Sequence, residues 1–156
     1  MGRGYFGIGI ERPKMAMNLG TLWRSAVCSD ADFIFTIGER FHKQASDTVQ
    51  SWRHVPCWRF DSVDDWHIPF GCVPIGVEIT DDAVPLETFV HPPRAVYLLG
   101  PEDGGLSDAA LAQCAQVVKI DTRYCLNVAT AGSIVMYDRQ TKAYRETRSM
   151  RRLAGG

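Results

Sequence analysis

The chain has 156 residues, which is enough for one domain with one sizeable core and leaves no room for a second. Apolar residues make up 46% of it and charged residues 22%, as in an average globular protein, which argues against disorder as the main state. The formal net charge of −1 does not by itself indicate a nucleic-acid partner, although a neutral protein can still carry a basic face.

Signals for membrane insertion, secretion and metal binding are missing from the sequence. No run approaches the roughly 20 apolar residues of a membrane span, and the opening MGRGYFGIGI lacks the features of a signal peptide. We therefore expect a cytoplasmic protein without a membrane partner. The five cysteines are odd in number and none are spaced as CxxC, so we expect reduced thiols, mostly in the core, rather than disulfides or a zinc site.

Strand and helix signals alternate in the first part of the chain. Residues 5–10 form a short apolar run closed by Pro13, which predicts a strand. Apolar residues recur at helical spacing over 17–29, with Asn18 at a capping position, and this predicts a helix. The β-branched and aromatic run at 32–38 ends in glycine and predicts a second strand.

The alternation continues to the end of the chain. We expect residues 39–56 to be a loop with some helix, and 61–66 to start a short helix. The remaining predicted elements are strands at 73–79, 95–99 and 117–120, a helix from Ser107 to about 115, and a long helix from Asn127 to about 148. This order predicts an α/β fold with a mainly parallel sheet and flanking helices. Ligands bind beyond the carboxyl ends of such strands, here after Ile37, Leu99 and Ile120.

The first stretch with chemical potential runs from Asn18 to Ala26, at the start of the first expected helix. Leu22, Trp23 and Ala26 would anchor that helix in the core, which leaves Arg24 beside an apolar seam. A guanidinium there needs an anionic or carbonyl partner. A substrate phosphate is one candidate, because its geometry matches the planar fork. A snorkelling arginine in a structural ion pair is the alternative.

A second stretch, Leu98 to Ser107, takes a buried strand into a glycine-rich loop and then a helix start. Glycines let the backbone approach a ligand closely. Glu102 and Asp103 make the loop negative, and the GxxxxGK[ST] pattern of a P-loop is missing. A neutral or cationic ligand such as S-adenosylmethionine therefore fits better than a triphosphate. The alternative is a tight turn whose acidic residues favour the helix start.

A third stretch, Ile120 to Gly132, ends a strand, crosses a short polar loop and begins a helix rich in small residues. Small residues let this helix pack closely on a loop or a second helix. Asn127 stands at a capping position, which is its simplest role. Cys125 precedes a helix N-terminus, which can activate a thiol. A nucleophilic cysteine needs a nearby base, however, and none of the four histidines is close to it in the sequence.

Together and in this order, the three stretches resemble the signature motifs of the SpoU/TrmH family of RNA 2′-O-methyltransferases, in the SPOUT class. Residues 18–26 are similar to N-x-G-x-x-x-R-x-A, and residues 100–107 to G-x-E-x-x-G-L-S. Residues 120–131 are similar to a motif with an I-P pair, a short variable loop and then S-L-N-V-x-x-A. The usual proline is Asp121 here and the usual serine is Cys125, a weaker hydrogen-bond partner.

The resemblance implies an α/β fold with a trefoil knot near the C-terminus. It assigns Arg24, Asn18, Glu102 and Asn127 to the catalytic region, with no metal. A guanidinium holds its proton too firmly to be a good base. We therefore expect Arg24 to clamp the phosphate beside the target ribose, with Asn18, Asn127 and Glu102 orienting it or the loop. The methyl donor, S-adenosylmethionine, is expected on two loops, at Leu99, Gly100, Glu102, Gly105, Ile120, Cys125 and Leu126.

The expected partners are RNA and a second copy of the chain. The chain resembles short stand-alone enzymes without a separate RNA-binding domain, several of which act on tRNA as homodimers; ribosomal RNA is the alternative substrate. A catalytically silent knotted RNA-binding module and a different nucleotide-binding α/β enzyme are competing hypotheses. Asp121 and Cys125 favour the former, and the missing P-loop and Rossmann patterns oppose the latter. The RNA-contact candidates are Arg40, Lys43, Arg53 and His54, and near the C-terminus Arg139, Lys142, Arg145, Arg148, Arg151 and Arg152. For the latter group, a solvated helix end is the alternative.

Overall fold

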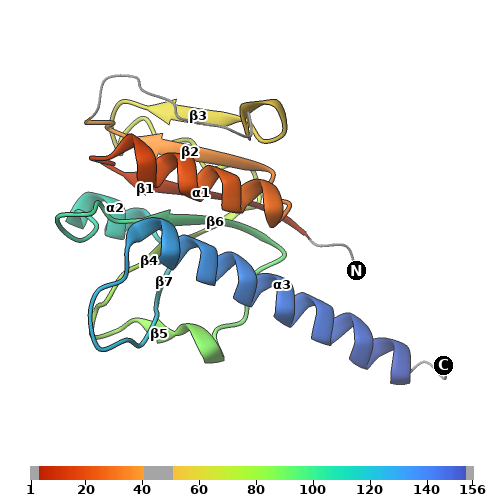
Figure 1. The fold of residues 1–156 in the computed structure, drawn as a ribbon. Coiled ribbons are helices and arrows are strands. Elements are labelled where there is room, and N and C mark those ends of the chain that lie inside the picture. Colours follow the sequence, from red (N-terminus) through yellow and green to blue (C-terminus); the bar gives the residue numbers. More distant parts are fainter. Residues whose placement is uncertain (1–3, 41–50, 154–156) are drawn as a thin grey trace.

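The computed structural model describes residues 4–40 and 51–153, with side chains described as far as residue 143. These residues form one sheet of seven strands in the order β3-β2-β1-β6-β4-β7-β5 (Figure 1). Every pairing between neighbouring strands is parallel, which confirms the predicted α/β class. The strands are β1 (Tyr5–Glu11), β2 (Phe33–Ile37), β3 (Cys57–Phe60), β4 (Val73–Val77), β5 (Val84–Pro85), β6 (Arg94–Leu99) and β7 (Gln116–Lys119).

Helices cover both faces of this sheet. Figure 1 shows α1 (Ala16–Cys28) and α3 (Val128–Leu153) over one face, while α2 (Asp108–Gln113) packs on the other. Two short 3-10 helices complete the secondary structure of the described residues, η1 (Ser51–Arg53) before β3 and η2 (Leu86–Thr88) after β5. None of the helices in these residues is long and apolar enough to cross a membrane.

The core consists of two apolar layers, one on each face of the sheet. Because side chains alternate along a strand, β6 sends Tyr97 and Leu99 toward α1 and α3, and Val96 and Leu98 toward α2. All four side chains are at most 2% exposed. A central strand buried on both faces explains why residues 95–99 form a continuous apolar run rather than an alternating one.

The small residues at the start of α3 allow it to pack directly on α1. A Cβ atom at Gly132 would overlap the Leu22 side chain, so the two helices approach where the glycine leaves room. Beside this contact the hydroxyl groups of Ser133 and Ser25 are hydrogen-bonded at 2.8 Å. The prediction that this small-residue segment packs closely on another helix is confirmed.

Several element boundaries differ from those predicted. Met15 is the N-cap of α1, so Asn18 lies inside the first turn and is not the cap. The expected short helix at 61–66 is wrong, since that segment consists of bends and turns. Ser107 and Asn127 do cap α2 and α3, through bonds from the backbone N–H groups of Ala110 at 3.1 Å and Ala129 at 3.0 Å. The trefoil knot, which the resemblance implies, stays a prediction.

Candidate functional site

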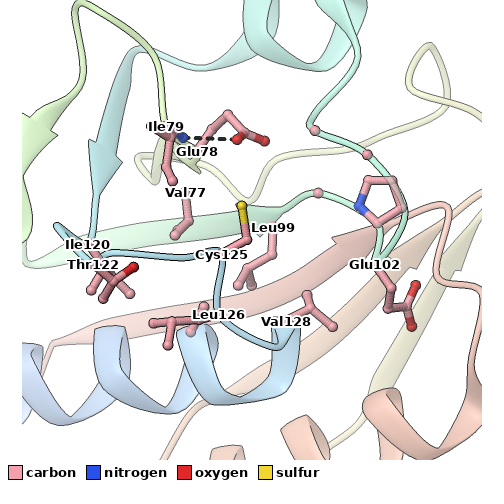
Figure 2. A pocket seen from close by; sticks show the side chains of 15 residues that line it. Val77, Glu78, Ile79, Leu99, Glu102, Ile120, Thr122, Cys125, Leu126 and Val128 are labelled. Atoms are coloured by element: carbon pink, nitrogen blue, oxygen red, sulfur yellow. Dashed lines mark hydrogen bonds between the residues drawn. The ribbon is translucent and has the colours of Figure 1, made fainter.

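A cavity of about 380 Å³ lies at the carboxyl ends of β4, β6 and β7, the edge of a parallel sheet where ligands bind (Figure 2). Three segments line it: the residues after β4, the glycine-rich loop after β6, and the loop between β7 and α3. Val128 and Ala131, in the first turns of α3, form part of its wall. Among the described residues, the segment after Ile37 contributes nothing to this lining.

The residues expected to hold the methyl donor come together around this cavity. They come from two loops far apart in the sequence and all line the same space: Leu99, Gly100, Glu102, Gly105, Ile120, Cys125 and Leu126. Figure 2 shows the Cys125 sulfur directed toward the cavity near Leu99. Their contact with a donor stays a prediction.

Gly100 allows the chain to fold back immediately after β6. A Cβ atom at this position would lie 2.8 Å from the backbone nitrogen of Leu106 and 2.9 Å from the carbonyl carbon of Gly105. Both neighbours are backbone atoms of the same loop and cannot move independently. The glycine is therefore required by the close approach of two backbone segments.

Two carboxylates hold the far end of the glycine-rich loop, and neither lies in a motif that the sequence singles out. Glu78, directly after β4, accepts hydrogen bonds from the backbone N–H groups of Leu106 at 2.8 Å and Ile79 at 2.9 Å, and it lines the cavity. Glu11, at the end of β1, is 2% exposed and accepts from the N–H and hydroxyl of Ser107 at 2.8 and 2.6 Å. The sequence signal that could have identified both residues is an acidic side chain at the carboxyl end of each of these two strands.

Three of the four predicted catalytic residues form one hydrogen-bonded chain. The Asn18 side-chain amide donates to Glu102 Oε1 at 2.8 Å, and the Asn127 amide donates to Asn18 Oδ1 at 3.0 Å. Glu102 also accepts from the backbone N–H groups of Lys14 at 2.9 Å and Met15 at 3.1 Å. These contacts join the glycine-rich loop, the start of α1 and the start of α3 at one edge of the cavity.

The hydrogen bonds also keep Glu102 ionised. Partial burial raises the pKa of its carboxyl group, but the bonds from the Asn18 side chain and from the Lys14 and Met15 backbone outweigh burial. The net result is a pKa below the ordinary value. Glu102 therefore presents a fixed negative charge at the cavity wall at neutral pH.

The sequence matches the SpoU rRNA Methylase family over residues 6–137, which is most of the chain. The chain belongs to this family. Comparison with curated proteins gives no match.

Solved structures share the fold of this SpoU-family chain. The SpoU methyltransferase AviRb from Streptomyces viridochromogenes is 25% identical, with a TM-score of 0.75. The match covers 86% of this chain but only 58% of AviRb, so the chain spans less than two thirds of that protein. A protein from A. aeolicus described as a TrmH/SpoU tRNA modifying enzyme is 18% identical, with a TM-score of 0.78. The match covers 93% of this chain and 77% of that protein.

Two further solved structures match this chain, and they differ in how much of their own length the match covers. AviRb has also been solved in complex with AdoMet, at 24% identity, a TM-score of 0.77 and coverage of 91% of this chain and 62% of that chain. A protein described under "2-OH methylation of C/U34 on tRNA" is 21% identical with a TM-score of 0.79. That match covers 92% of this chain and 94% of the other, so the two are of similar length.

Arg24, the fourth predicted catalytic residue, lies apart from the other three. Its side chain is exposed on α1, and no group of the described residues forms an ion pair or hydrogen bond with its guanidinium. Of the two roles expected for Glu102, Asn18 and Asn127, orienting Arg24 or the loop, their hydrogen bonds fit the second. The bonds of Glu102 and Asn18 go to each other and to Lys14, Met15 and Asn127, and none goes to Arg24. The alternative of a structural ion pair for Arg24 finds no support either.

The RNA-contact candidates among the described residues do not form one surface. The Arg40 guanidinium donates to Asp103 Oδ1 at 2.6 Å, so it is already paired with a carboxylate of its own chain. Arg53 lies over the Trp52 ring at 5.1 Å, and His54 is exposed beside it. Both come just before β3, at the amino edge of the sheet, opposite the cavity (Figure 1). Lys43 lies outside the described residues.

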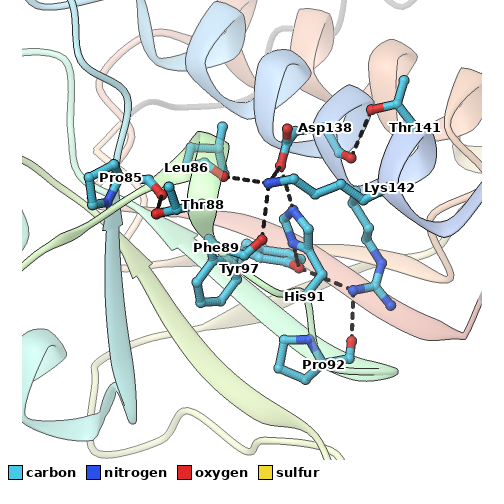
Figure 3. Close-up of polar contacts among 11 residues, drawn as sticks. Pro85, Leu86, Thr88, Phe89, His91, Pro92, Tyr97, Asp138, Thr141 and Lys142 are labelled. Carbon is cyan, nitrogen blue, oxygen red and sulfur yellow. Dashed lines mark hydrogen bonds and ion pairs between the residues drawn. The ribbon is translucent and has the colours of Figure 1, made fainter. Parts of the chain in front are cut away.

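Two of the C-terminal candidates are structural. Arg139 is 4% exposed and donates to the carbonyl oxygens of Pro92 at 2.8 Å and Pro93 at 3.0 Å, so its predicted role in RNA contact is wrong. Lys142 donates to the carbonyl oxygens of Leu86 at 2.6 Å and Phe89 at 3.0 Å (Figure 3). The side chains of Arg145, Arg148, Arg151 and Arg152 lie outside the described residues.

The cysteines are free, as predicted, but they are less buried than expected. Cys28 and Cys125 are exposed, and the other three are half-buried. Burial raises the pKa of Cys57 and of Cys114 to about 11, which makes both thiols unreactive at neutral pH. In the described part of the chain no cluster of three or more histidine, cysteine or acidic side chains is arranged to hold a metal ion.

Proposed function

We propose that this protein transfers a methyl group from S-adenosylmethionine to a ribose 2′-hydroxyl of RNA, and that the RNA is a tRNA. The observation that carries the proposal is the cavity bordered by the Glu102–Asn18–Asn127 chain in a member of the SpoU family. The protein described under "2-OH methylation of C/U34 on tRNA" has a similar length and the same fold. This supports a ribose hydroxyl as the group that is methylated and tRNA as the substrate. Ribosomal RNA is the alternative substrate, in keeping with the family's description.

The cavity fits S-adenosylmethionine in size and charge. Its volume of about 380 Å³ is within the range of small-molecule sites. Leu99, Ile120 and Leu126 supply apolar surface for a nucleoside, and the glycine-rich loop supplies backbone groups for its polar edge. The charged lining residues are Glu78 and Glu102, both acidic, which suits a cationic ligand better than a phosphate. AviRb, solved with AdoMet, is a family precedent.

When bound, S-adenosylmethionine supplies a methyl group activated by the sulfonium. The protein's contribution is to hold this group and the ribose hydroxyl in line, which is worth up to about 7–11 kcal/mol in ideal intramolecular cases. The Glu102–Asn18–Asn127 chain fixes three segments around the cavity before any ligand arrives. Arg24 clamps the phosphate next to the target ribose with its planar fork, and the hydroxyl proton leaves to that phosphate or to water.

This use of Arg24 requires a second copy of the chain. Arg24 is six residues after Asn18, which places it about 9 Å further along α1 and about 120° round the helix. Asn18 faces the cavity edge of its own chain, so Arg24 faces away from it. We infer a homodimer in which Arg24 reaches the cavity of the partner subunit.

A direct assay tests the proposal. Isothermal calorimetry with S-adenosylmethionine and with its demethylated product, S-adenosylhomocysteine, measures binding. Transfer of a radioactive methyl group to tRNA and to ribosomal RNA fragments measures activity and identifies the RNA. A 2′-deoxy nucleotide at the modified position must abolish transfer if the acceptor is the ribose hydroxyl. Absence of ligand binding, or methyl transfer to the deoxy substrate, would contradict the proposal.

A catalytically silent RNA-binding module is the second candidate, and Asp121 and Cys125 are the observations that favour it. Cys125 lines the cavity where the family motif has a serine. This candidate expects tight RNA binding with no methyl transfer to any RNA in the same assay. The Cys125→Ser variant, which restores the hydroxyl, would then gain activity that the native chain lacks.

A further inference from the structure

The glycine-rich loop, residues 100–105, carries two adjacent acids that have different surroundings. Glu102 lines the cavity and binds the start of α1. Asp103 does not line the cavity, and its side chain is 43% exposed. Both Asp103 oxygens are nevertheless engaged: Arg40 donates to Oδ1 at 2.6 Å and to Oδ2 at 3.1 Å, and the Lys14 ammonium lies 3.3 Å from Oδ2.

Arg40 is itself held in place by the backbone. Its Nε donates to the carbonyl oxygen of Arg12 at 2.8 Å, and its backbone N–H donates to the carbonyl oxygen of Pro13 at 3.1 Å. Arg12 in turn donates its backbone N–H to the carbonyl oxygen of Ile37 at 2.6 Å. Lys14, Arg40 and Asp103, here called the Asp103 cluster, therefore connect the glycine-rich loop to the segments that follow β1 and β2.

We propose that Asp103 is a positioning residue that holds the glycine-rich loop in its ligand-binding shape through Arg40 and Lys14. This inference rests on the proposed function, because that loop forms one wall of the proposed donor cavity. A loop that is already ordered loses less conformational entropy when a ligand binds, so the ligand binds more tightly. The two-pronged Arg40 contact fixes direction as well as distance, which a single ion pair does not.

The location of the cluster predicts a local rather than a global effect. Exposed ion pairs contribute little to the free energy of unfolding, so losing this one leaves the melting temperature nearly unchanged. Glu78 and Glu11 still hold the far end of the loop through Leu106 and Ser107. Loss of Asp103 therefore loosens the near end of the loop alone, where Glu102 and Gly100 meet the cavity.

The competing explanation is that Arg40 contacts RNA, which is the role expected from the sequence. If Arg40 is an RNA contact, its replacement weakens RNA binding and leaves donor binding unchanged. If Arg40 supports the loop, its replacement and that of Asp103 both weaken donor binding, and RNA is not needed to observe the effect. The Asp103 change has the larger effect, because it also removes the Lys14 contact. The two explanations therefore differ in a binding experiment that contains no RNA.

The probe for this experiment is S-adenosylhomocysteine, which lacks the sulfonium charge, so its affinity reports on the loop rather than on attraction to Asp103. Calorimetry on the full chain compares the native protein with Asp103→Asn, Arg40→Ala and the double variant. We expect about fivefold weaker binding for Asp103→Asn, a smaller loss for Arg40→Ala because Lys14 still pairs with Asp103, and no loss in the double variant beyond that of Asp103→Asn. Arg59→Ala is the matched control, since Arg59 forms an exposed ion pair with Glu39 at 3.0 Å that does not touch the loop.

Hydrogen exchange without any ligand supplies a second readout. Amide protons of residues 102–105 should exchange faster in Asp103→Asn than in the native protein, while those in α3 and in Arg59→Ala do not change. Equal probe affinity in native and variant proteins, or unchanged exchange, would overturn the role of the cluster. A native protein that does not bind the probe would overturn the proposed function instead, and the exchange comparison would still decide for or against the cluster.

Discussion

Single residues shape the cavity more by backbone packing than by side-chain chemistry. Gly100 and Gly104 both line it, but they differ in what surrounds them. A Cβ atom at Gly100 meets loop backbone within 3 Å, whereas at Gly104 the nearest atom is Pro101 Cγ at 4.0 Å. Two glycines in one loop therefore provide an internal comparison between a required and a permissive position.

We expect Gly100→Ala to weaken S-adenosylhomocysteine binding by at least about tenfold, because the added methyl group pushes the loop out of shape at a cost of about 1–3 kcal/mol. Gly104→Ala should bind within about twofold of the native protein, since the methyl group enters open space and the substitution only restricts the unfolded chain. Calorimetry on both variants, with circular dichroism as a check on folding, measures the difference. Equal affinities would contradict the packing argument.

The sequence motifs identified most residues around the cavity but not how they work together. Asn18, Glu102 and Asn127 were predicted to share a site and they do. Glu78 and Asp103 were not assigned roles, because each acts on a segment distant in the sequence, Leu106 for Glu78 and Arg40 for Asp103. Such pairings depend on how strands are ordered in the sheet, which local patterns do not specify.

At the scale of elements, α3 is held to the sheet by apolar packing near its start. Further along, it is held by a polar cluster that consists of His91, Tyr97 and Asp138 (Figure 3). His91 is the centre of that cluster: its Nε2 lies 2.8 Å from Asp138 Oδ2 and its Nδ1 lies 2.6 Å from the Tyr97 hydroxyl. The carboxylate can only accept, so Nε2 carries the proton and Nδ1 accepts from Tyr97 in the neutral ring. Burial raises the pKa of Tyr97 to about 12, which keeps that hydroxyl protonated.

Protonation of His91 should weaken this attachment. Burial lowers the pKa of His91 and outweighs the opposing effects of the hydrogen bond that His91 donates to Asp138 and of the Asp138 charge, while the neighbouring Arg139 and Lys142 charges lower this pKa further. As the pH falls through about 6.5, the unfolded chain takes up this proton before the folded chain does, so the free energy of unfolding decreases until the folded-state pKa is passed. The stabilisation is complete at higher pH.

Urea unfolding at pH 7 and pH 5 measures the effect. We expect the native protein to lose more stability over this interval than His91→Gln, at most about 1.4 kcal/mol per pH unit for one group. His67→Gln is the control, because His67 is exposed and lies outside the polar cluster. Parallel losses in the native protein and in His91→Gln would exclude His91 as the titrating group.

The elements that the sequence predicted well are the strands that are buried along almost their whole length. The runs at 5–10, 32–38 and 95–99 became β1, β2 and β6, the centre of the sheet. The missed strands, β3 and β5, lie at its two edges. β3 has the mixed sequence CWRF, and β5 has two residues, one of them a proline, which cannot donate a hydrogen bond within the sheet. An edge strand has a neighbouring strand on one side only and is more exposed to solvent. Its sequence therefore predicts a strand less clearly than that of a central strand.

At the scale of the whole molecule, the separation of Arg24 from the other site residues is the feature that needs explanation. The chain has a cavity at the carboxyl ends of β4, β6 and β7, which is the proposed donor site, and the resemblance implies a homodimer. In the described residues Arg24 is exposed and unpaired, on a face of α1 turned away from its own cavity. A dimer in which each Arg24 serves the partner's cavity accounts for this arrangement without any rearrangement of the chain.

Mixed dimers test that arrangement. At a donor concentration well below the dissociation constant of Gly100→Ala, Arg24→Ala and Gly100→Ala should each be nearly inactive alone, the first with donor binding intact and the second with donor binding weakened. In a dimer of one copy of each, the intact cavity of the Arg24→Ala chain faces the native Arg24 of the Gly100→Ala chain, which restores one of the two sites. Random pairing then returns about a quarter of native activity. If Arg24 acts on its own chain, no pairing creates a complete site, and the mixture stays as inactive as its parts. Light scattering on each preparation confirms that dimers, rather than the 17.4 kDa chain alone, are being compared.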